Sequence, residues 1–118
     1  MRLLADTNFL IACVKKRMLD ELKESFSEIL VPNGVIDELT KISKEGGASD
    51  RISAELALKL ISLLKIRVLH DFGYVDEQII NYSKKEGIVV ATLDKKLQKV
   101  LQGRAKLLIL RGRKFIVE

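Results

Sequence analysis

The stretch RLLADTNFLIACV, residues 2–14, decides the fold class of this chain. Residues 2–5 have the length and apolar character of a short buried strand, and Asp6-Thr7-Asn8 follow that strand directly. Residues 9–14 are apolar on every side, which is typical of a buried helix. The stretch therefore predicts a buried strand that leads straight into a buried helix, with a carboxylate at the junction.

The same alternation of apolar strand and helix continues through the rest of the chain. Further strands are predicted at 28–31, 66–69, 88–91, 107–110 and 114–117, and further helices at 18–26, 35–43, 50–64, 75–86 and 95–102. The strands are continuous apolar runs and do not alternate with polar residues, which is typical of a parallel sheet covered on both faces. We therefore expect an α/β fold with a central, mostly parallel sheet.

Local signals set the expected helix boundaries. Residues 45–49 (EGGAS) are predicted to form a loop, and Asp50 is predicted to cap the helix that follows. In that helix, which is expected to run to Leu64, leucines recur at four-residue steps, a spacing typical of a helix: Leu56, Leu60 and Leu64. Gly87 is expected to close the helix at 75–86 as its C-terminal cap.

Length and composition exclude several classes of protein. The 118 residues are 47% hydrophobic and 31% charged, which fits one domain with its own core. The longest apolar run, residues 9–14, is too short to span a bilayer, and the N-terminal residues do not resemble a signal peptide, so a cytoplasmic location is expected. One cysteine, Cys13, and one histidine, His70, exclude a disulfide framework within the chain and a Cys/His zinc site. The net charge of +5 fits a polyanionic partner, although many small proteins with lysine-rich surfaces share it.

Acidic residues follow each of the first four predicted strands. Asp6 follows the first strand directly, and Asp94 follows the fourth by two residues. Glu38 lies in the helix after the second strand, and Asp76 begins the helix after the third. Because the C-terminal ends of parallel strands lie along one edge, where ligands bind in a crevice, these four acids are expected to meet there.

Helical phase distinguishes each of two acids from its neighbour. At about 100° per residue, Glu38 borders the apolar face of its helix while Asp37 points away. Asp76 falls within the apolar side of the next helix while Glu77 points outward. An acid on a packed face is unusual, so Glu38 and Asp76 are the predicted site residues.

Ionised carboxylates gathered at one crevice need a partner. Two unit charges ~6 Å apart repel by about 3 kcal/mol at an effective dielectric of 20. A single divalent cation would offset this repulsion, and oxygen ligands favour Mg²⁺ or Mn²⁺ over zinc. Such an ion activates water and neutralises charge on a phosphodiester.

Each acid also has a simpler interpretation. Asp6 and Asp94 are in position to cap the helices that follow them, Glu38 to be a solvated helix residue, and Asp76 to be a favourable charge in a first turn. Asn8 is interpreted as a helix cap or as a group that orients a metal-bound water. Thr92 is expected to support the loop before Asp94.

The ordered set of motifs resembles the PIN-domain family. Asp6-Thr7-Asn8-Phe9-Leu10 looks like its opening motif and Val35-Ile36-Asp37-Glu38-Leu39 like its second. Asp76 with Ile79 and Ile80 looks like the third motif, and Ala91-Thr92-Leu93-Asp94 like the fourth. The resemblance covers nearly the whole chain, which implies a single PIN-like nuclease domain over residues 1–118.

The resemblance implies a three-layer α/β/α sandwich and a divalent-metal-dependent endoribonuclease that cleaves single-stranded RNA. Carried over by motif, the catalytic and metal-binding residues are Asp6, Glu38, Asp76 and Asp94, with Asn8 and Thr92 in supporting roles. Toxin-type members often carry a further acid where this chain has Lys96, so the sequence is more similar to the branch that processes pre-ribosomal RNA. A homodimer and an antitoxin or ribosome-assembly partner are expectations from the same resemblance.

Basic residues near the acids are candidates for contacts with RNA phosphates. They are Lys95, Lys96, Lys99, Arg111, Arg113 and Lys114. For each single lysine, a solvated helix surface explains the charge equally well.

Three other functions compete with the nuclease. Phosphatases of the haloacid dehalogenase type need a second Asp where this chain has Asn8, and response-regulator receivers need paired acids that residues 2–5 do not offer. A non-catalytic RNA-binding or assembly module with the same fold is the remaining alternative, and retention of all four acids argues against it.

Overall fold

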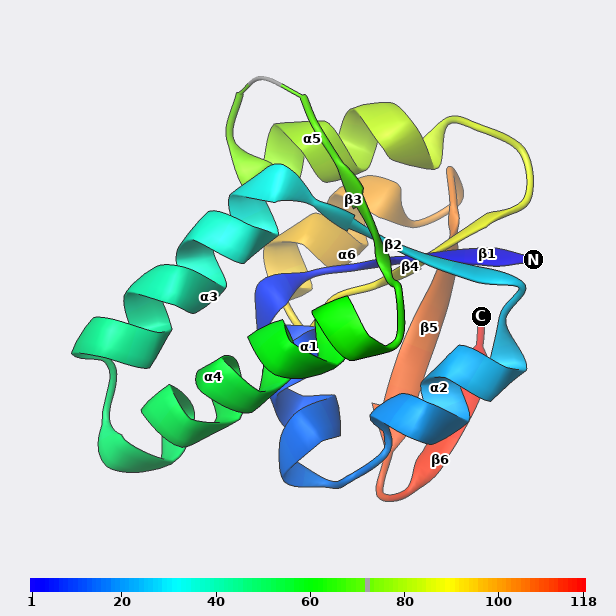
Figure 1. The fold of residues 1–118 in the computed structure, drawn as a ribbon. Coiled ribbons are helices and arrows are strands. Elements are labelled where there is room, and N and C mark those ends of the chain that lie inside the picture. The colour runs from blue at the N-terminus through cyan, green and yellow to red at the C-terminus, as the bar shows by residue number, and fades with distance from the viewer. Residues whose placement is uncertain (72) are drawn as a thin grey trace.

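The chain folds as the sequence of residues 2–14 predicts, with a buried strand that leads directly into a buried helix. The structure, a computed structural model, describes residues 1–71 and 73–118 (Figure 1). Its strands are β1 (Arg2–Ala5), β2 (Glu28–Pro32), β3 (Arg67–Leu69), β4 (Ile88–Ala91), β5 (Lys106–Arg111) and β6 (Lys114–Val117). Its helices are α1 (Thr7–Lys15), α2 (Leu19–Ser25), α3 (Asn33–Glu45), α4 (Ala48–Leu63), α5 (Val75–Ser83) and α6 (Lys95–Leu101).

The strands form one mostly parallel sheet, as expected. Their order is β3-β2-β1-β4-β5-β6, with β1 to β5 parallel and β6 antiparallel to β5. The central strand β1 pairs on both sides, so that Leu4 lies opposite Leu30 and Val90. The C-terminal ends of β1, β2 and β4 therefore lie side by side at one edge of the sheet.

Helices cover both faces of this sheet, which makes a three-layer α/β/α sandwich. Leu3 of β1 packs into a core with residues of α1, α2, α3 and α4, whereas Leu4 packs into a second core with α5 and α6. Figure 1 shows α5 on one side of the sheet and α4 on the other. Because successive side chains point to opposite faces and both faces are buried here, the central strands β1, β2 and β4 are largely apolar runs.

The longest described helix, α4, differs from its prediction at its start. It begins at Ala48, and Asp50 lies in its first turn, where the carboxylate pairs with Lys15 Nζ at 2.6 Å and does not cap the helix. The predicted loop is therefore confined to Gly46 and Gly47. Because small side chains let α4 approach α1 and α3 closely, its buried residues are Ser53, Ala54, Ala57 and Ile61. Of the leucines at four-residue steps, Leu60 and Leu64 are partly buried and pack against the core, whereas Leu56 is 43% exposed.

Other helix ends shift by a few residues. Helix α3 begins two residues earlier than predicted, directly after Pro32. Helix α5 ends at Ser83, so the prediction that Gly87 is its cap was wrong. Gly87 lies in the turn before β4 with φ of +73°, a left-handed conformation that favours glycine, and its carbonyl accepts a hydrogen bond from Arg2 N. Among the described residues, no helix is long and apolar enough to cross a membrane.

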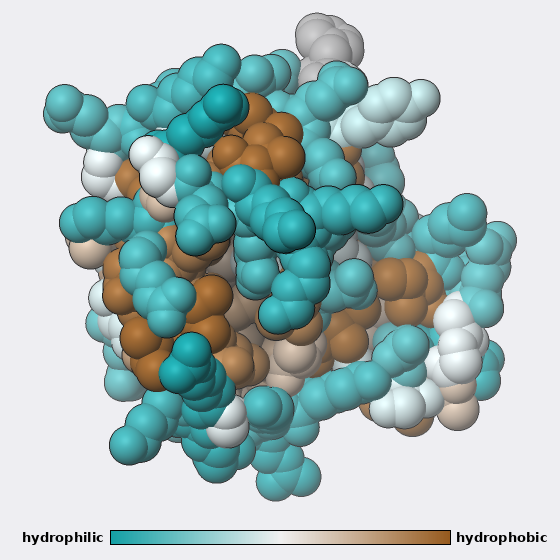
Figure 2. All heavy atoms as spheres, turned by 180° about the vertical axis from the view of Figure 1, so that it is seen from behind, coloured by the Kyte–Doolittle hydropathy of each residue, from teal (hydrophilic) through white to brown (hydrophobic). Residues whose placement is uncertain are grey.

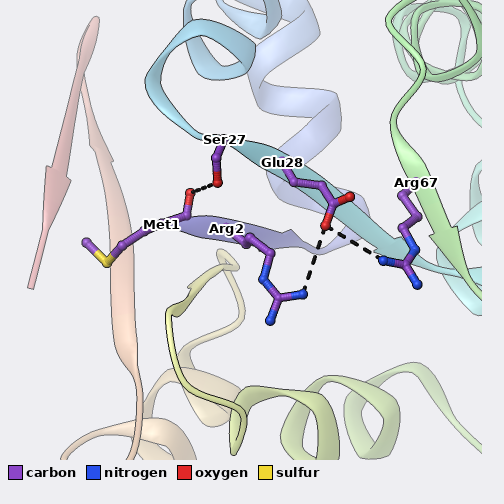
Figure 3. A network of polar contacts seen from close by, with 5 residues as sticks. All are labelled: Met1, Arg2, Ser27, Glu28 and Arg67. Carbon is purple, nitrogen blue, oxygen red and sulfur yellow. Dashed lines mark hydrogen bonds and ion pairs between the residues drawn. The ribbon is translucent and has the colours of Figure 1, made fainter.

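A polar network joins the N-terminal ends of β1, β2 and β3, at the edge of the sheet opposite the predicted site (Figure 3). Glu28 Oε1 lies 4.0 Å from Arg2 Nη1 and 3.8 Å from Arg67 Nη1. Ser27 Oγ donates a hydrogen bond of 3.0 Å to the Met1 carbonyl oxygen. One carboxylate thus lies between two guanidinium groups, at a part-exposed position.

Candidate active site

The four acids predicted from the sequence line one cleft at the C-terminal ends of the strands. This acidic cleft has a volume of about 620 Å³ and is lined by Asp6, Thr7, Asn8, Gly34, Asp37, Glu38, Ile42, Gly73, Tyr74, Val75, Asp76 and Asp94. Five of these side chains are carboxylates, and none of the lining residues is Lys, Arg or His. The acids that follow the strands therefore lie around one cleft, as expected from their positions in the sequence.

Asp6 is the buried acid of the cleft and also caps α1. Its side chain is 8% exposed. Oδ1 accepts a hydrogen bond of 2.8 Å from Thr7 N, and Oδ2 accepts one of 2.8 Å from Thr92 Oγ1. Desolvation by burial raises the pKa of Asp6 above its ordinary value of 3.8, and the negative charges of Glu38 and Asp76 raise it further. The two hydrogen bonds oppose this shift of the pKa, because they favour the ionised form.

Glu38 is connected to the start of α1 through a hydroxyl group. Thr7 Oγ1 donates a hydrogen bond of 2.9 Å to Glu38 Oε1. Thr7 therefore contacts two acids, because its backbone N–H binds Asp6 and its side chain binds Glu38. This arrangement fixes the two carboxylates relative to each other.

A close approach of two helices brings Glu38 and Asp76 to the same cleft. A Cβ atom added at Gly34, in the first turn of α3, would lie 2.6 Å from Val75 Cγ2 at the start of α5. Only glycine leaves room for this contact between the N-terminal turns of α3 and α5. The absence of a side chain at Gly34 thus sets the separation of the acids on these helices.

Asp94 caps α6 and is tied to Asp6 through Thr92. Asp94 Oδ1 accepts hydrogen bonds from Lys96 N at 2.9 Å and from Leu97 N at 3.2 Å. Thr92 Oγ1 accepts from Asp94 N at 3.1 Å and donates to Asp6 Oδ2. The supporting role expected of Thr92 thus has a structural basis, and both aspartates are caps as well as cleft residues.

The structure corrects three details of the predicted site. Glu38 and Asp76 are exposed at the cleft surface and do not lie on packed helix faces. Helical phase distinguished Asp76 from Glu77, which does not line the cleft, but failed to exclude Asp37, which does. Asn8 is not a cap, since Asp6 holds that position, and its exposed side chain lines the cleft from the first turn of α1.

The carboxylates surround the cleft but do not meet at a single point. Within residues 1–71 and 73–118, no group of three or more Asp, Glu, His or Cys side chains is close enough to hold a metal ion by itself. The donor set, which consists only of oxygen atoms, is the chemistry that Mg²⁺ prefers. Because Mg²⁺ usually keeps several waters and binds through one or two carboxylates, the residues present fit a partly hydrated divalent ion.

The predicted RNA-binding residues fall into two groups. Lys95, Lys96 and Lys99 are exposed on α6, beside the acidic cleft residue Asp94. The other group lies in the β5–β6 hairpin. There Arg113 donates a hydrogen bond of 2.7 Å to the Lys16 carbonyl oxygen and forms an ion pair with Glu21 at 3.9 Å. Arg111 pairs with Glu118 at 3.8 Å, and none of Arg111, Arg113 and Lys114 lines the acidic cleft.

Sequence reasoning missed several residues of the cleft, among them Asp37, Tyr74 and Gly34. Helical phase argued against Asp37, although its place beside Glu38 on a wide, open cleft allows both to face it. Tyr74 is 81% exposed at the rim and carries no acidic signal. Gly34 could be interpreted only once the contact of α3 with α5 was known. Cys13, by contrast, is buried as expected, and desolvation by burial raises the pKa of its thiol to about 12.

Comparison with known proteins identifies the class of fold. The family model described as a PIN-like domain matches residues 3–113, so this chain belongs to the PIN-like domain family. PIN-like domains are generally nucleases, and the fold is therefore a nuclease fold.

One solved structure extends the likeness over the whole chain. It is a domain of a functionally unknown protein from Methanocaldococcus jannaschii DSM 2661, with a TM-score of 0.63 and 18% sequence identity over 99% of this chain and 96% of that chain. At this level of identity the likeness concerns the fold alone. No curated protein matches the sequence.

Proposed function

We propose that this protein is a divalent-metal-dependent endoribonuclease that cleaves single-stranded RNA at the acidic cleft. The observation that supports the proposal is the composition of that cleft, which has five carboxylates and no basic residue in its lining. Asp6 has the strongest need for a counter-charge, because burial and two neighbouring carboxylates disfavour its ionised form. A bound cation removes this cost, and a cation at such a cleft attracts a phosphodiester.

The residues of the cleft have distinct roles in this proposal. Asp6, Glu38, Asp76 and Asp94 would hold Mg²⁺ or Mn²⁺, which when bound supplies an activated water and charge neutralisation for phosphodiester hydrolysis. Thr7 and Thr92 donate hydrogen bonds that favour the ionised form of Asp6 and orient its two oxygens. Asn8, at the surface of the cleft, is placed to hydrogen-bond a water or a phosphate oxygen.

The biological role of the proposed nuclease is a separate question. We favour the processing of ribosomal RNA over the toxin role, because Lys96 stands where toxin-type members often have a further acid. Lys96 is exposed and lies outside the lining of the acidic cleft, so its ammonium group does not replace that acid as a cleft residue. A toxin-type ribonuclease and a non-catalytic RNA-binding module are the alternatives.

Cleavage of a labelled, unstructured RNA in Mg²⁺, Mn²⁺ or EDTA tests the proposal. Wild type should cleave only with metal, and Asp6→Asn, Glu38→Gln, Asp76→Asn and Asp94→Asn should each lower the rate at least tenfold, which corresponds to about 1.4 kcal/mol of barrier. Glu77→Gln is the matched control, because Glu77 shares a helix with Asp76 but does not line the cleft. An equal loss in the control and the four variants would contradict the assignment, and RNA binding without cleavage would favour the non-catalytic module.

A further inference from the structure

A second groove lies between α6 and the beginning of β5. It has a volume of about 710 Å³ and is lined by four cationic side chains, Lys95, Lys99, Arg104 and Lys106. Leu107 and Ile109 of β5 give it an apolar floor. Figure 2 shows the molecule from behind, with hydrophobic side chains exposed over β5 and β6 and hydrophilic side chains around them. We call this feature the basic groove.

The charges of the basic groove are not neutralised within the described part of the chain. The ion pairs there use Arg2, Lys15, Lys59, Arg67, Arg111 and Arg113, and none of the four groove cations. The acid in the groove lining is Glu118, which pairs with Arg111 at 3.8 Å. The groove therefore presents a net positive surface that a polyanion would neutralise.

The basic groove begins beside the acidic cleft, at the N-terminus of α6. Helix α6 begins next to its cap Asp94, an acid of the cleft, and its seven residues extend about 10 Å along the groove. Lys95 and Lys99 are four residues apart, so they lie on one side of this helix. Lys95 also lines a small pocket with Thr92 and Arg111, and Thr92 is the residue that hydrogen-bonds Asp6.

We propose that the basic groove holds the phosphate backbone of single-stranded RNA on one side of the bond that is cut. This inference rests on the proposed nuclease function and adds the path of the substrate. Among the described residues, none that lines the groove is aromatic and able to stack on bases, so contacts to phosphates dominate and binding tolerates many sequences. Of the RNA-binding candidates predicted from the sequence, this path includes Lys95 and Lys99 but not Lys96. Arg104 and Lys106 are additional contacts that the groove suggests.

Salt dependence of RNA binding is the direct test. Binding of a fluorescein-labelled oligouridylate is measured by anisotropy in EDTA over a series of KCl concentrations, for wild type and for the triple variant Lys99→Ala, Arg104→Ala, Lys106→Ala. The slope of log affinity against log salt should fall by about 2, because each phosphate that a cation neutralises on a single strand contributes ~0.7 to the slope. The matched control is Lys41→Ala, Lys44→Ala, Lys84→Ala, which removes three exposed lysines outside the groove and the cleft.

The possible outcomes distinguish failure of the proposed RNA path from failure of the proposed nuclease function. An unchanged slope in the groove variant, or an equal fall in the control, would overturn the proposed path, and so would competition by polyglutamate as strong as that by unlabelled RNA. Metal-dependent cleavage by wild type with an unchanged slope would leave the nuclease in place without this path. A fall confined to the groove variant, in a protein that cleaves no RNA, would support the groove and contradict the nuclease.

Discussion

Carboxylates at the two ends of the sheet differ in whether basic side chains of the protein lie beside them. At the N-terminal end, Glu28 lies between Arg2 and Arg67 at a part-exposed position, so its charge is balanced by the chain itself. At the C-terminal end, Asp6 is buried among other acids, and no basic residue lines the cleft. An acid that the fold leaves unbalanced marks a place where a cation from outside the chain would be stabilising, whereas a balanced acid marks a structural contact.

The geometry of the acidic cleft depends on the close contact between Gly34 of α3 and Val75 of α5. Gly34→Val should lower the free energy of unfolding by about 1–3 kcal/mol, because its side chain would clash with Val75 Cγ2, which lies 2.6 Å from the position of the added Cβ. It should also lower cleavage, because α3 carries Glu38 and α5 carries Asp76. Urea denaturation and the cleavage assay measure the two effects. Gly47→Val is the control, since an added Cβ there meets nothing within 4 Å. Equal losses at both glycines would contradict the proposed role of this contact.

The raised pKa of Asp6 predicts a pH dependence of stability in the metal-free protein. A carboxyl group whose pKa is higher in the folded state binds its proton more tightly there, so stability is highest below the unfolded pKa and falls as pH rises through the folded pKa. Asp6→Asn should remove this fall, because the amide carries no charge. Thermal melts in EDTA from pH 3.5 to 7 provide the measurement, with Glu28→Gln as the control expected to keep the fall. A wild-type protein whose stability rises through this range in the same way as that of Asp6→Asn would exclude the predicted shift.

Substitution of Glu28, at the N-terminal end of the sheet, should have the smallest effect on stability and activity. Glu28→Gln removes two long ion pairs, at 4.0 and 3.8 Å, between groups that are 34–59% exposed. Such pairs contribute up to about 1 kcal/mol, so the free energy of unfolding should change by no more than this, and RNA cleavage should stay within twofold of wild type. Denaturation and the cleavage assay check both values. A large loss of activity in this variant would mean that the two ends of the sheet do not differ as proposed.

The order of strands and helices could be predicted because apolar runs in the sequence mark where each of them lies. The bounds of β1, β4 and β6 agree with the prediction, and the other strands agree within a few residues. The buried face of α4 could not be predicted in the same way, because Ala54 and Ala57 are buried for their small size while the larger Leu56 stays exposed. Hydrophobicity alone does not tell which helices pack closely.

The site could be predicted as far as local rules determine it. Asp6 follows β1 directly and Asp94 lies two residues beyond the end of β4, so strand ends were sufficient to place them in one cleft. Helical phase was a weaker guide for Glu38 and Asp37, because both face an open cleft rather than a packed core. The bridge that Thr92 forms between Asp6 and Asp94 joins residues far apart in sequence, and no local pattern predicts it.

The central claim is that the acidic cleft binds a divalent cation, and thermal melts with and without Mn²⁺ test it most directly. At a hundredfold excess over the dissociation constant, the ion should stabilise wild type by about 2.7 kcal/mol. The same addition should stabilise Asp6→Asn and Asp94→Asn much less, whereas Glu28→Gln should respond as wild type does. The same metal-induced shift in all four proteins would contradict the claim, because binding would then be independent of the acids of the cleft.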